Sequence, residues 1–452
     1  MTDYGVSGKR RASGHHRSLS VPTLRRNIPF QLLWIGGVVD ELGSELTQLA
    51  MPLLILAVTN SPGWAGIIAG TYTAAHVLAQ LPAGVWVDRW DRRLTLLASY
   101  GIRSVASAVL AGLIVVGEVK MAYFMVFAGI DGICTAFVRP AWTTAIRGVV
   151  PQAQLPSAYA QEEAGRHATG LVGAPLGGLL YQLGRVIPFI IDAASFAVAT
   201  LCVYLARVPR RPPHHDPDTA AGREQAKRGI RHEAWEAAAW LYHQRGLRMT
   251  FLVAFVVNLL GIAFFIPLIV LVRDRGANSV AIGTVLAGAG IGGLVGALLS
   301  RKISALLPPG RLLLAIVAFT GVAFATMPLP FGPWWPMIPL ILLSLLPPAA
   351  NVVISVAVTR LVPENMLGRV QAALILTAMG LTPLGPIMGG ALASWLGGSG
   401  SILLLAGLAL LTAALFCTSH ELRTFTCTDP EIDHSDNPPT DDKDQQDTNR
   451  PL

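Results

Sequence analysis

Apolar runs long enough to cross a lipid bilayer recur along almost the whole chain of 452 residues. A hydrocarbon core of about 30 Å is crossed by a helix of about 20 predominantly apolar residues. Only 13% of the residues are charged, whereas a soluble domain carries roughly 25%. Because so few charged side chains cannot cover a water-exposed surface, we predict an all-α integral membrane protein.

We place roughly twelve such runs, and the prolines and glycines that interrupt several of them leave a count of about eleven to thirteen open. The runs span approximately residues 30–56, 63–87, 95–116, 121–145, 166–184, 187–206, 249–272, 280–300, 311–329, 335–359, 370–394 and 400–418. We therefore expect a bundle of twelve transmembrane helices.

Lys and Arg are distributed unevenly between the segments that connect these runs, and cytoplasmic loops normally carry the excess. With a cytoplasmic N-terminus, the outer loops hold only Lys120, Arg185, Arg273 and Arg275. The cytoplasmic segments then hold Lys9, Arg10, Arg11, Arg25, Arg26, Arg89, Arg92, Arg93, Arg210, Arg211, Lys227, Arg228, Arg231, Arg245, Arg301, Lys302, Arg311, Arg360 and Arg369. We predict a multi-pass plasma-membrane protein with both termini in the cytoplasm. The net charge of +7 is then a topology signal and not a nucleic-acid-binding surface.

Polar segments divide the chain into parts. Residues 1–27 are basic and lack an apolar core, so we expect a disordered cytoplasmic arm and not a signal peptide. Residues 28–206 and 249–418 are two six-helix halves, joined by a cytoplasmic linker at 207–248. Residues 419–452, rich in Asp, Asn and Pro, form a disordered acidic tail. The four cysteines show no CxxC spacing, and we expect neither a metal site nor a cofactor.

Features of the first half recur in the second at a constant offset. Pro151 and Pro363 follow the fourth and tenth runs, and their separation equals that between Gly173 and Gly385. Two parallel repeats of six helices explain this pattern. Such repeats are a transporter architecture, in which a substrate site near the membrane midplane is opened to either side in turn by rocking of the halves.

Three segments resemble one family of transporters. Gly84-Val-Trp-Val-Asp88-Arg89-Trp-Asp-Arg92-Arg93 resembles motif A of the major facilitator superfamily. Residues 191–196 and 360–370 are similar to segments of its drug:proton antiporter branch, which includes macrolide efflux proteins and a siderophore exporter. The resemblance covers about residues 25–420. Within the two latter segments, the residues that we interpret as mainly structural are Asp192, Ser195, Phe196, Pro363, Gly368 and Arg369.

Motif A implies a conformational latch. Its Asp88 would accept hydrogen bonds at the N-terminus of a helix across the interface between the halves, where the helix dipole favours negative charge. The motif's arginines would fix this aspartate or bind lipid phosphate. In the resembling family the latch stabilises the outward-open state. The alternative is that these charges only set the topology. The latch residues are Gly84, Asp88, Arg89, Arg92 and Arg93.

A second element resembles the antiporter motif, motif C, of the same family. In the eleventh run it has the regular form Gly-Pro-x-x-Gly-Gly, whereas in the fifth run its proline is displaced by one residue. Proline removes a backbone hydrogen bond and permits bending. A gating role and a role in helix packing both stay open. The residues of the two copies are Gly173, Pro175, Gly177, Gly178, Gly385, Pro386, Gly389 and Gly390.

Ionisable side chains at membrane depth are costly and therefore mark functional sites. In the first half they are Asp40, Glu41, Glu45, His76, Arg103 and Asp131, and the second half has no charged residue within its runs. Glu41 and Glu45 share one helix face at i,i+4. Carboxylates shielded from water can exchange protons near neutral pH, or they can bind a cationic drug. The alternatives are a permanent ion pair of Arg103 with Asp131 or Glu41, and a His76 that only packs between helices instead of shuttling protons.

The resemblance implies a secondary active exporter of amphipathic small molecules, such as drugs or antibiotics, coupled to protons through alternating access. A dedicated exporter of one secreted metabolite, such as a siderophore or a self-made antibiotic, stays open, as does a non-transporting scaffold or sensor. We expect no enzyme, because the inner loops contain no Ser/His/Asp, metal-binding or ATP-binding pattern. The expected partners are a small-molecule substrate, protons and membrane lipid, with the chain acting as a monomer.

Overall fold

The computed structural model describes residues 24–208, 245–306, 308–361 and 380–417. All regular structure within these ranges is helical. Leu24–Arg26, at the end of the predicted arm, form a short 3₁₀ helix, η1. The remainder of the arm, most of the linker and the tail lie outside the described residues, as do Pro363, Gly368 and Arg369.

The first half of the chain folds into long helices that match the first six predicted runs. They are α1 (Ile28–Thr59), α2 (Pro62–Arg89), α3 (Arg92–Val116), α4 (Met121–Val149), α5 (Leu155–Leu183) and α6 (Ile187–Ala206). A second 3₁₀ helix, η2 (Gln152–Gln154), leads into α5.

The described helices of the second half lie in the remaining runs, of which residues 370–379 are outside the described part, and they differ from the prediction in two places. They are α9 (Arg245–Asp274), α10 (Ser279–Leu306), α11 (Pro309–Thr326), α12 (Met337–Ser344), α13 (Pro347–Leu361) and α15 (Leu384–Cys417). The run at 335–359 is broken into α12 and α13, because Pro347 and Pro348 cannot continue a preceding helix. The last two runs meet within α15 at Gly397, whose φ of 65° bends the chain between them.

Local sequence explains several helix boundaries. Asn27 caps α1, because its side chain accepts a hydrogen bond from the Phe30 amide at 3.2 Å, and Asn60 ends this helix in the left-handed conformation with φ of 51°. Asp91 caps α3 in the same way. Gly117, at φ of 83°, ends α3. These capped, short connections make α1, α2 and α3 run antiparallel to one another.

The outer surface of the bundle is suited to lipid. Seven of the described helices are long and apolar enough to cross a membrane, namely α1, α3, α4, α6, α9, α10 and α15. Large apolar side chains point outward, with Leu78, Val116, Leu298 and Trp395 between 74% and 84% exposed. Such a surface would be unfavourable in water. The chain is therefore an all-helical integral membrane protein, as predicted.

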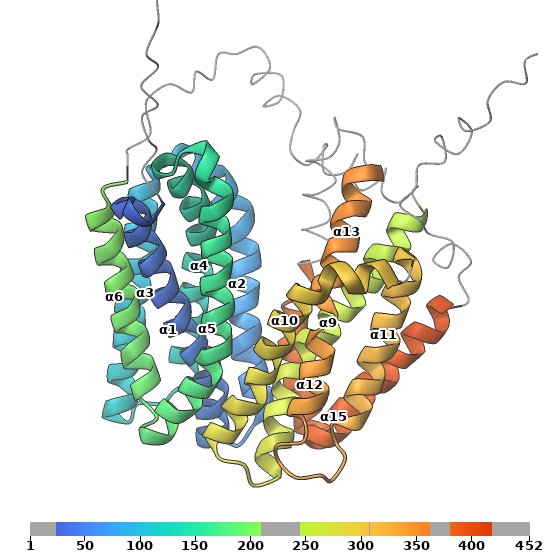
Figure 1. Cartoon of the computed structure of the whole chain (residues 1–452). Coiled ribbons are helices and arrows are strands. Elements are labelled where there is room, and N and C mark those ends of the chain that lie inside the picture. The colour runs from blue at the N-terminus through green and yellow to red at the C-terminus, as the bar shows by residue number, and fades with distance from the viewer. Residues whose placement is uncertain (1–23, 209–244, 307, 362–379, 418–452) are drawn as a thin grey trace, which may run out of the picture.

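The helices form two bundles, one from α1–α6 and one from α9–α15 (Figure 1). We call the end at which α6 finishes and α9 begins the linker end, and the opposite end the far end. Between the bundles, α2 packs against α15 and α5 packs against α10. In the predicted repeat, α2 corresponds to α10 and α5 corresponds to the first part of α15. The contact of α2 with α15 is therefore the counterpart of the contact of α10 with α5. The packing thus has the two-fold pseudosymmetry that the sequence offset predicts.

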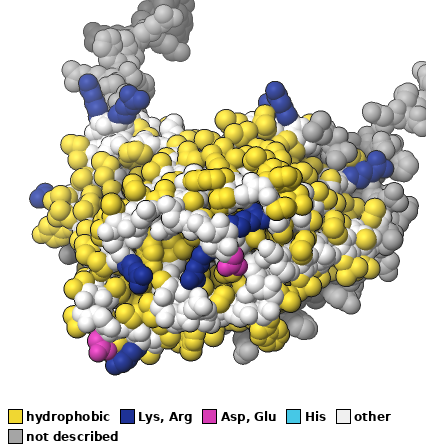
Figure 2. All heavy atoms as spheres, turned by 90° about the horizontal axis from the view of Figure 1, so that it is seen from below, with side chains coloured by type: hydrophobic (Ala, Val, Ile, Leu, Met, Phe, Trp, Pro, Cys, Tyr) yellow, Lys and Arg dark blue, Asp and Glu magenta, His cyan; other side chains and the backbone are white. Residues whose placement is uncertain are grey.

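The two bundles touch most closely near the far end. A Cβ atom added to Gly66, one turn into α2, would lie 2.5 Å from the Pro386 carbonyl oxygen and 2.9 Å from the Gly390 Cα. On the other side of the interface, a Cβ on Gly178 of α5 would collide with the carbonyl oxygen of Ser279. Only glycine permits such backbone contacts. The far end is closed, and Figure 2 shows its surface as mostly apolar with few charged side chains.

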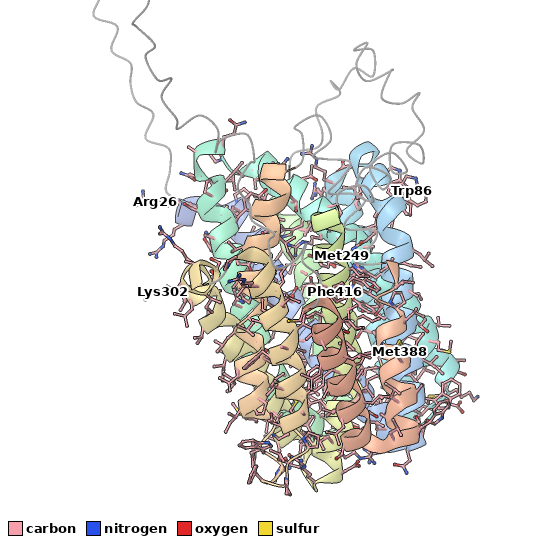
Figure 3. All side chains as sticks on the ribbon, turned by 90° about the vertical axis from the view of Figure 1, so that its right-hand side faces the viewer. Arg26, Trp86, Met249, Lys302, Met388 and Phe416 are labelled. Atoms are coloured by element: carbon pink, nitrogen blue, oxygen red, sulfur yellow. The ribbon has the colours of Figure 1, made fainter. Side chains whose placement is uncertain are left out.

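The bundles separate toward the linker end, where the described basic side chains gather. Figure 3 shows Arg26 and Trp86 near this end, pointing away from the bundle. Trp86 is 45% exposed and stacks on Trp90, which is itself half exposed. Tryptophans at this depth are typical of the membrane–water interface.

Candidate functional site

A cavity of about 1000 Å³ lies between the two bundles. It extends from Trp34 and Trp142, within about two helical turns of the linker end, to Pro52 and Ala65 near the far end. Drug-sized ligands occupy pockets of about 300–1,000 Å³. The cavity is therefore large enough for a small organic molecule, and the close glycine contacts shut it off at the far end.

The walls of this cavity differ sharply in chemistry. Among the described residues, the ionisable lining comes from the first half, namely Asp40, Glu41, Glu45, Tyr72, His76, Tyr100, Arg103, Asp131, Arg139, Glu162, Arg166 and Asp192. The described lining from the second half is apolar or glycine, namely Gly261, Ile262, Phe265, Ile266 and Pro386. The structure thus brings together every ionisable residue predicted at membrane depth. An amphipathic molecule would find polar partners on one side and an apolar surface on the other.

Arg103 is the centre of a buried ion network on the polar side. Its guanidinium donates to Asp131 Oδ1 at 2.6 Å, to Asp40 Oδ1 at 2.9 Å and to Ser44 Oγ at 3.0 Å. Phe196 lies beneath it, with 4.0 Å from the Arg103 Cζ to the ring centroid. The residue is only 3% exposed. This network joins α1, α3, α4 and α6, so it fixes the polar wall of the cavity.

The network contains one of the two pairs considered for Arg103 and one that was not considered. The ion pair with Asp131 is present, but the second partner is Asp40 and not Glu41. Successive helix residues differ in direction by about 100°. Asp40 therefore faces Arg103 while Glu41 is turned along the cavity wall. Of the predicted coupling candidates, Asp40 and Asp131 already have a strong cationic partner in this conformation.

Glu41 and Glu45 are the two carboxylates of α1 that stay available to a ligand. Both line the cavity and are half-buried, and neither forms an ion pair or hydrogen bond with another described residue. The Glu45 side chain packs over Gly173 of α5, where an added Cβ would lie 2.5 Å from the Glu45 Cβ. Gly173, predicted as part of motif C, thus makes room for a carboxylate of the cavity.

His76 belongs to a separate polar group on α2. Its Nε2 lies 2.9 Å from Gln80 Nε2, and its ring stacks on Tyr72 with a centroid distance of 6.2 Å. It lines the cavity but makes no ion pair with the carboxylates of the described residues. His76 is therefore not part of the ion network around Arg103 in this structure.

The two copies of motif C are helix-packing faces arranged in the same way. Gly177 of α5 packs against α1, and Gly389 of α15 packs against α9, each within its own half. The neighbouring glycines, Gly178 and Gly390, instead contact the other half, at Ser279 and at Pro62–Gly66. Each motif therefore packs within its half and also closes the far end. Pro175 lies inside α5, whereas Pro386 lies in the first turn of α15, and Gly385 contacts Ile262 of α9.

The described part of motif A stays within the first half. Arg92 donates to the Thr144 carbonyl oxygen of α4 at 3.1 Å. Arg93 donates to the Tyr204 carbonyl oxygen of α6 at 2.9 Å and lies over the Tyr204 ring. An atom added at Gly84 would meet nothing within 4 Å. The side chains of Asp88 and Arg89 lie outside the described residues, so their latch across the interface stays a prediction.

Three functional contributions were missed at the level of sequence. Asp91, between the motif A arginines, caps α3 by accepting hydrogen bonds from the amides of Arg93 at 2.8 Å and Leu94 at 3.4 Å. Its position before a helix was a usable signal. Ser44 lies one turn after Asp40, so helical spacing could have placed it beside Arg103. Tyr100, one turn before Arg103, is 2% exposed and lies beside Asp40, although a buried tyrosine in a helix carries no such signal alone.

Comparison with known proteins places this geometry in context. The family profile described as Major Facilitator Superfamily matches residues 33–382. The chain is 27% identical over 387 residues to the multidrug efflux pump Tap of Mycolicibacterium fortuitum, which covers 81% of this chain and 89% of that protein. It is 26% identical over 191 residues to macrolide efflux protein A of Streptococcus pyogenes, covering 40% of this chain and 45% of that protein.

Solved structures share the fold at lower sequence identity. A bacterial homolog of the human lysosomal transporter Spinster, in an inward-facing and unoccupied conformation, superposes with a TM-score of 0.64 at 18% identity and covers 87% of this chain and 96% of that chain. The nucleoside transporter NupG superposes with a TM-score of 0.64 at 15% identity, covering 88% and 100%. At these identities the likeness shows only a shared fold, which in this chain is two helical bundles with a cavity between them.

Proposed function

Since the chain belongs to the major facilitator superfamily, we propose that it is a secondary active exporter of amphipathic small molecules, driven by protons through alternating access. The similarity to named multidrug and macrolide efflux proteins supports the export of drug-like substrates. The observation that carries the proposal is the central cavity with Glu41 and Glu45 on one wall and an apolar surface opposite. This combination suits a molecule with a cationic or polar group and an apolar body.

The linker end is assigned to the cytoplasm. Exposed basic residues of the described chain at this end include Arg25, Arg26, Arg147, Arg301 and Lys302. The far end has only Lys120, Arg185, Arg273 and Arg275, as counted from the loops. The excess of positive charge favours the cytoplasmic side for the linker end. The conformation is then inward-facing, with the cavity receiving substrate from the cytoplasm.

Glu41 and Glu45 are the proposed coupling residues. One helical turn separates them, so two negative charges on this face repel one another, and binding of a single proton relieves the repulsion. A cationic substrate relieves it in the same way. Protons and substrate therefore compete for the same pair of carboxylates, which is the requirement for exchanging one for the other. Asp40 and Asp131 do not take part in this competition, because both are ion-paired with Arg103.

Alternating access requires the far-end contacts to open. The glycine contacts of Gly66 with α15 and of Gly178 with α10 are the seams that separate in this step. They are backbone contacts between small residues, and the described part of the chain has no ion pair across them. Beside them, Arg273 of α9 donates across the interface to the Leu56 carbonyl oxygen at 3.5 Å. Separation of such seams costs less than the breaking of a charged interface. The outward-facing state is then the one in which motif A would connect the halves at the linker end.

The test is transport by the purified full-length chain in proteoliposomes with an imposed pH gradient, screened with cationic dyes, macrolides and siderophores. We expect gradient-driven movement of at least one class, abolished in the Glu41→Gln/Glu45→Gln double variant. Glu118→Gln, which alters an exposed carboxylate at the far end, is the matched control and should transport normally. Transport that ignores the gradient, or the absence of transport for every class, would contradict proton-driven export. Movement of a single class would favour a dedicated exporter.

A further inference from the structure

Asp192 of α6 is a buried carboxyl group with a hydrogen bond to only one of its two oxygens among the described residues. The residue is 1% exposed. Its Oδ2 accepts a hydrogen bond from Ser107 Oγ of α3 at 2.9 Å. Its Oδ1 has no hydrogen-bond partner among the described residues. A carboxylate oxygen without a donor, in the interior of a membrane protein, strongly disfavours the charged form of the group.

The charges around Asp192 also disfavour its charged form. The positive charge of Arg103 already faces two ion-paired carboxylates, those of Asp40 and Asp131. Asp192 lies within electrostatic range of both Arg103 and Asp131. With Asp40 and Asp131 ionised, the group around Arg103 has an excess of one negative charge before Asp192 is counted. A third carboxylate would add repulsion without a second cation to offset it.

The space beside the free oxygen is narrow. A Cβ on Gly43 of α1 would lie 3.0 Å from Asp192 Oδ1 and would collide with Ser195 Oγ. The backbone of α1 therefore packs directly on this carboxyl group. Among the described residues, no group of three or more His, Cys, Asp or Glu side chains could hold a metal ion. A proton is the cation that fits this position without displacing α1.

Thr47 of α1 supplies the matching partner. Its side chain lies beside the Asp192 carboxyl, and its hydroxyl has no hydrogen-bond partner among the described residues. A hydroxyl can either accept or donate a hydrogen bond. It can accept from a protonated Asp192 and, after turning about its Cβ–Oγ bond, donate to the ionised form. Both residues also line the cavity, which gives a proton a route to and from this site.

We propose that Asp192 is a second proton-binding residue of the transport machinery, loaded with a proton in this conformation and hydrogen-bonded to Thr47. Release breaks the O–H bond of the carboxylic acid. The proton passes to water in the cavity, and Thr47 then donates to the carboxylate that is left. This inference rests on the proposed proton coupling and assigns a role to a residue interpreted from the sequence as mainly structural. Glu41 and Glu45 exchange protons against substrate, whereas Asp192 binds one within the α1–α3–α6 seam.

Infrared spectroscopy of the purified protein tests the bound proton independently of transport. A protonated carboxylic acid has a C=O stretching band that a carboxylate lacks and that shifts in D₂O. We expect one component of this band to be missing in Asp192→Asn and unchanged in Asp274→Asn, which alters an exposed far-end carboxylate. A full band in Asp192→Asn would overturn the proposal. If this variant does not fold, Thr47→Val decides the question, because loss of the acceptor must shift the band, and an unshifted band would refute the assignment.

Transport then tests whether this proton takes part in coupling. Asp192→Asn should lose the response to the pH gradient in proteoliposomes while it keeps exchange of labelled for unlabelled substrate, which needs no net proton movement. A purely structural role would lower both activities together, and a normal response to the gradient would also contradict the proposal. If the wild-type protein itself ignores the gradient, the proposed function fails, whereas the infrared result still shows whether Asp192 binds a proton.

Discussion

Replacement of Arg103 by methionine should destabilise the first half of the protein strongly. Methionine fills a similar volume but leaves the Asp40 and Asp131 carboxylates in a buried site without their cation. Removal of one partner of a buried ion pair costs about 3–5 kcal/mol. For a domain of about 150–250 residues each kcal/mol lowers the Tm by roughly 2–4 °C, so the expected loss is about 6–20 °C.

Matched variants separate this charge effect from loss of packing. In Arg103→Met/Asp40→Asn/Asp131→Asn the buried charges are removed together, and most of the lost stability should return, because a neutral buried group needs no counter-ion. Lowering the pH should also narrow the gap between Arg103→Met and wild type, since protons then neutralise the orphaned carboxylates. Thermal unfolding in detergent, followed by tryptophan fluorescence, measures both effects. An Arg103→Met protein as stable as wild type, or a triple variant no better than the single one, would refute the reasoning.

Two further predictions concern helix packing and capping. Gly66→Ala should loosen the far end, because its Cβ would lie 2.5 Å from the Pro386 carbonyl oxygen. A cysteine introduced at Ser61 should then react faster with a membrane-impermeant thiol reagent. Gly101→Ala, whose Cβ would meet nothing within 4 Å, should leave the labelling rate unchanged. Equal labelling rates would argue against the seam. Asp91→Ala should cost about 0.5–2 kcal/mol through loss of the α3 cap, and Asp91→Asn should cost little, as measured by thermal unfolding; equal losses in both variants would place the effect elsewhere.

The sequence predicts the membrane architecture well, because the thickness of the bilayer fixes the length of an apolar run and the repeat fixes the correspondence between halves. Within the described residues the predicted runs lie in helices. The differences are the break before Pro347, the bend at Gly397 and the start of α5 at Leu155 instead of near residue 166. Proline and glycine in the middle of such a run indicate that the helix is interrupted, but not whether it bends or breaks. The extent of the interruption depends on which neighbouring helix satisfies the freed backbone groups.

The ionisable residues of the cavity were predicted, and an Arg103–Asp131 pair was one of the alternatives, but the pairing of Arg103 with Asp40 was not predicted. Charged residues at membrane depth must face the protein interior, so their convergence follows from the sequence. Whether Arg103 meets Asp40 or Glu41 depends on the rotation of α1 about its axis, which is set by packing against α5 and α6. The contacts of Arg92 and Arg93 within the first half could not be predicted from motif A, because the spacing of arginines along the chain does not fix which carbonyl oxygens their side chains reach.

Proton release on substrate binding tests the central claim most directly. The purified protein is placed in weakly buffered detergent solution with a pH indicator, and a substrate identified by the transport screen is added. If substrate displaces protons from Glu41 and Glu45, the wild-type protein releases protons on binding, and Glu41→Gln/Glu45→Gln binds the same substrate without releasing them. Substrate binding without proton release by the wild-type protein, or equal release by the double variant, would contradict the account.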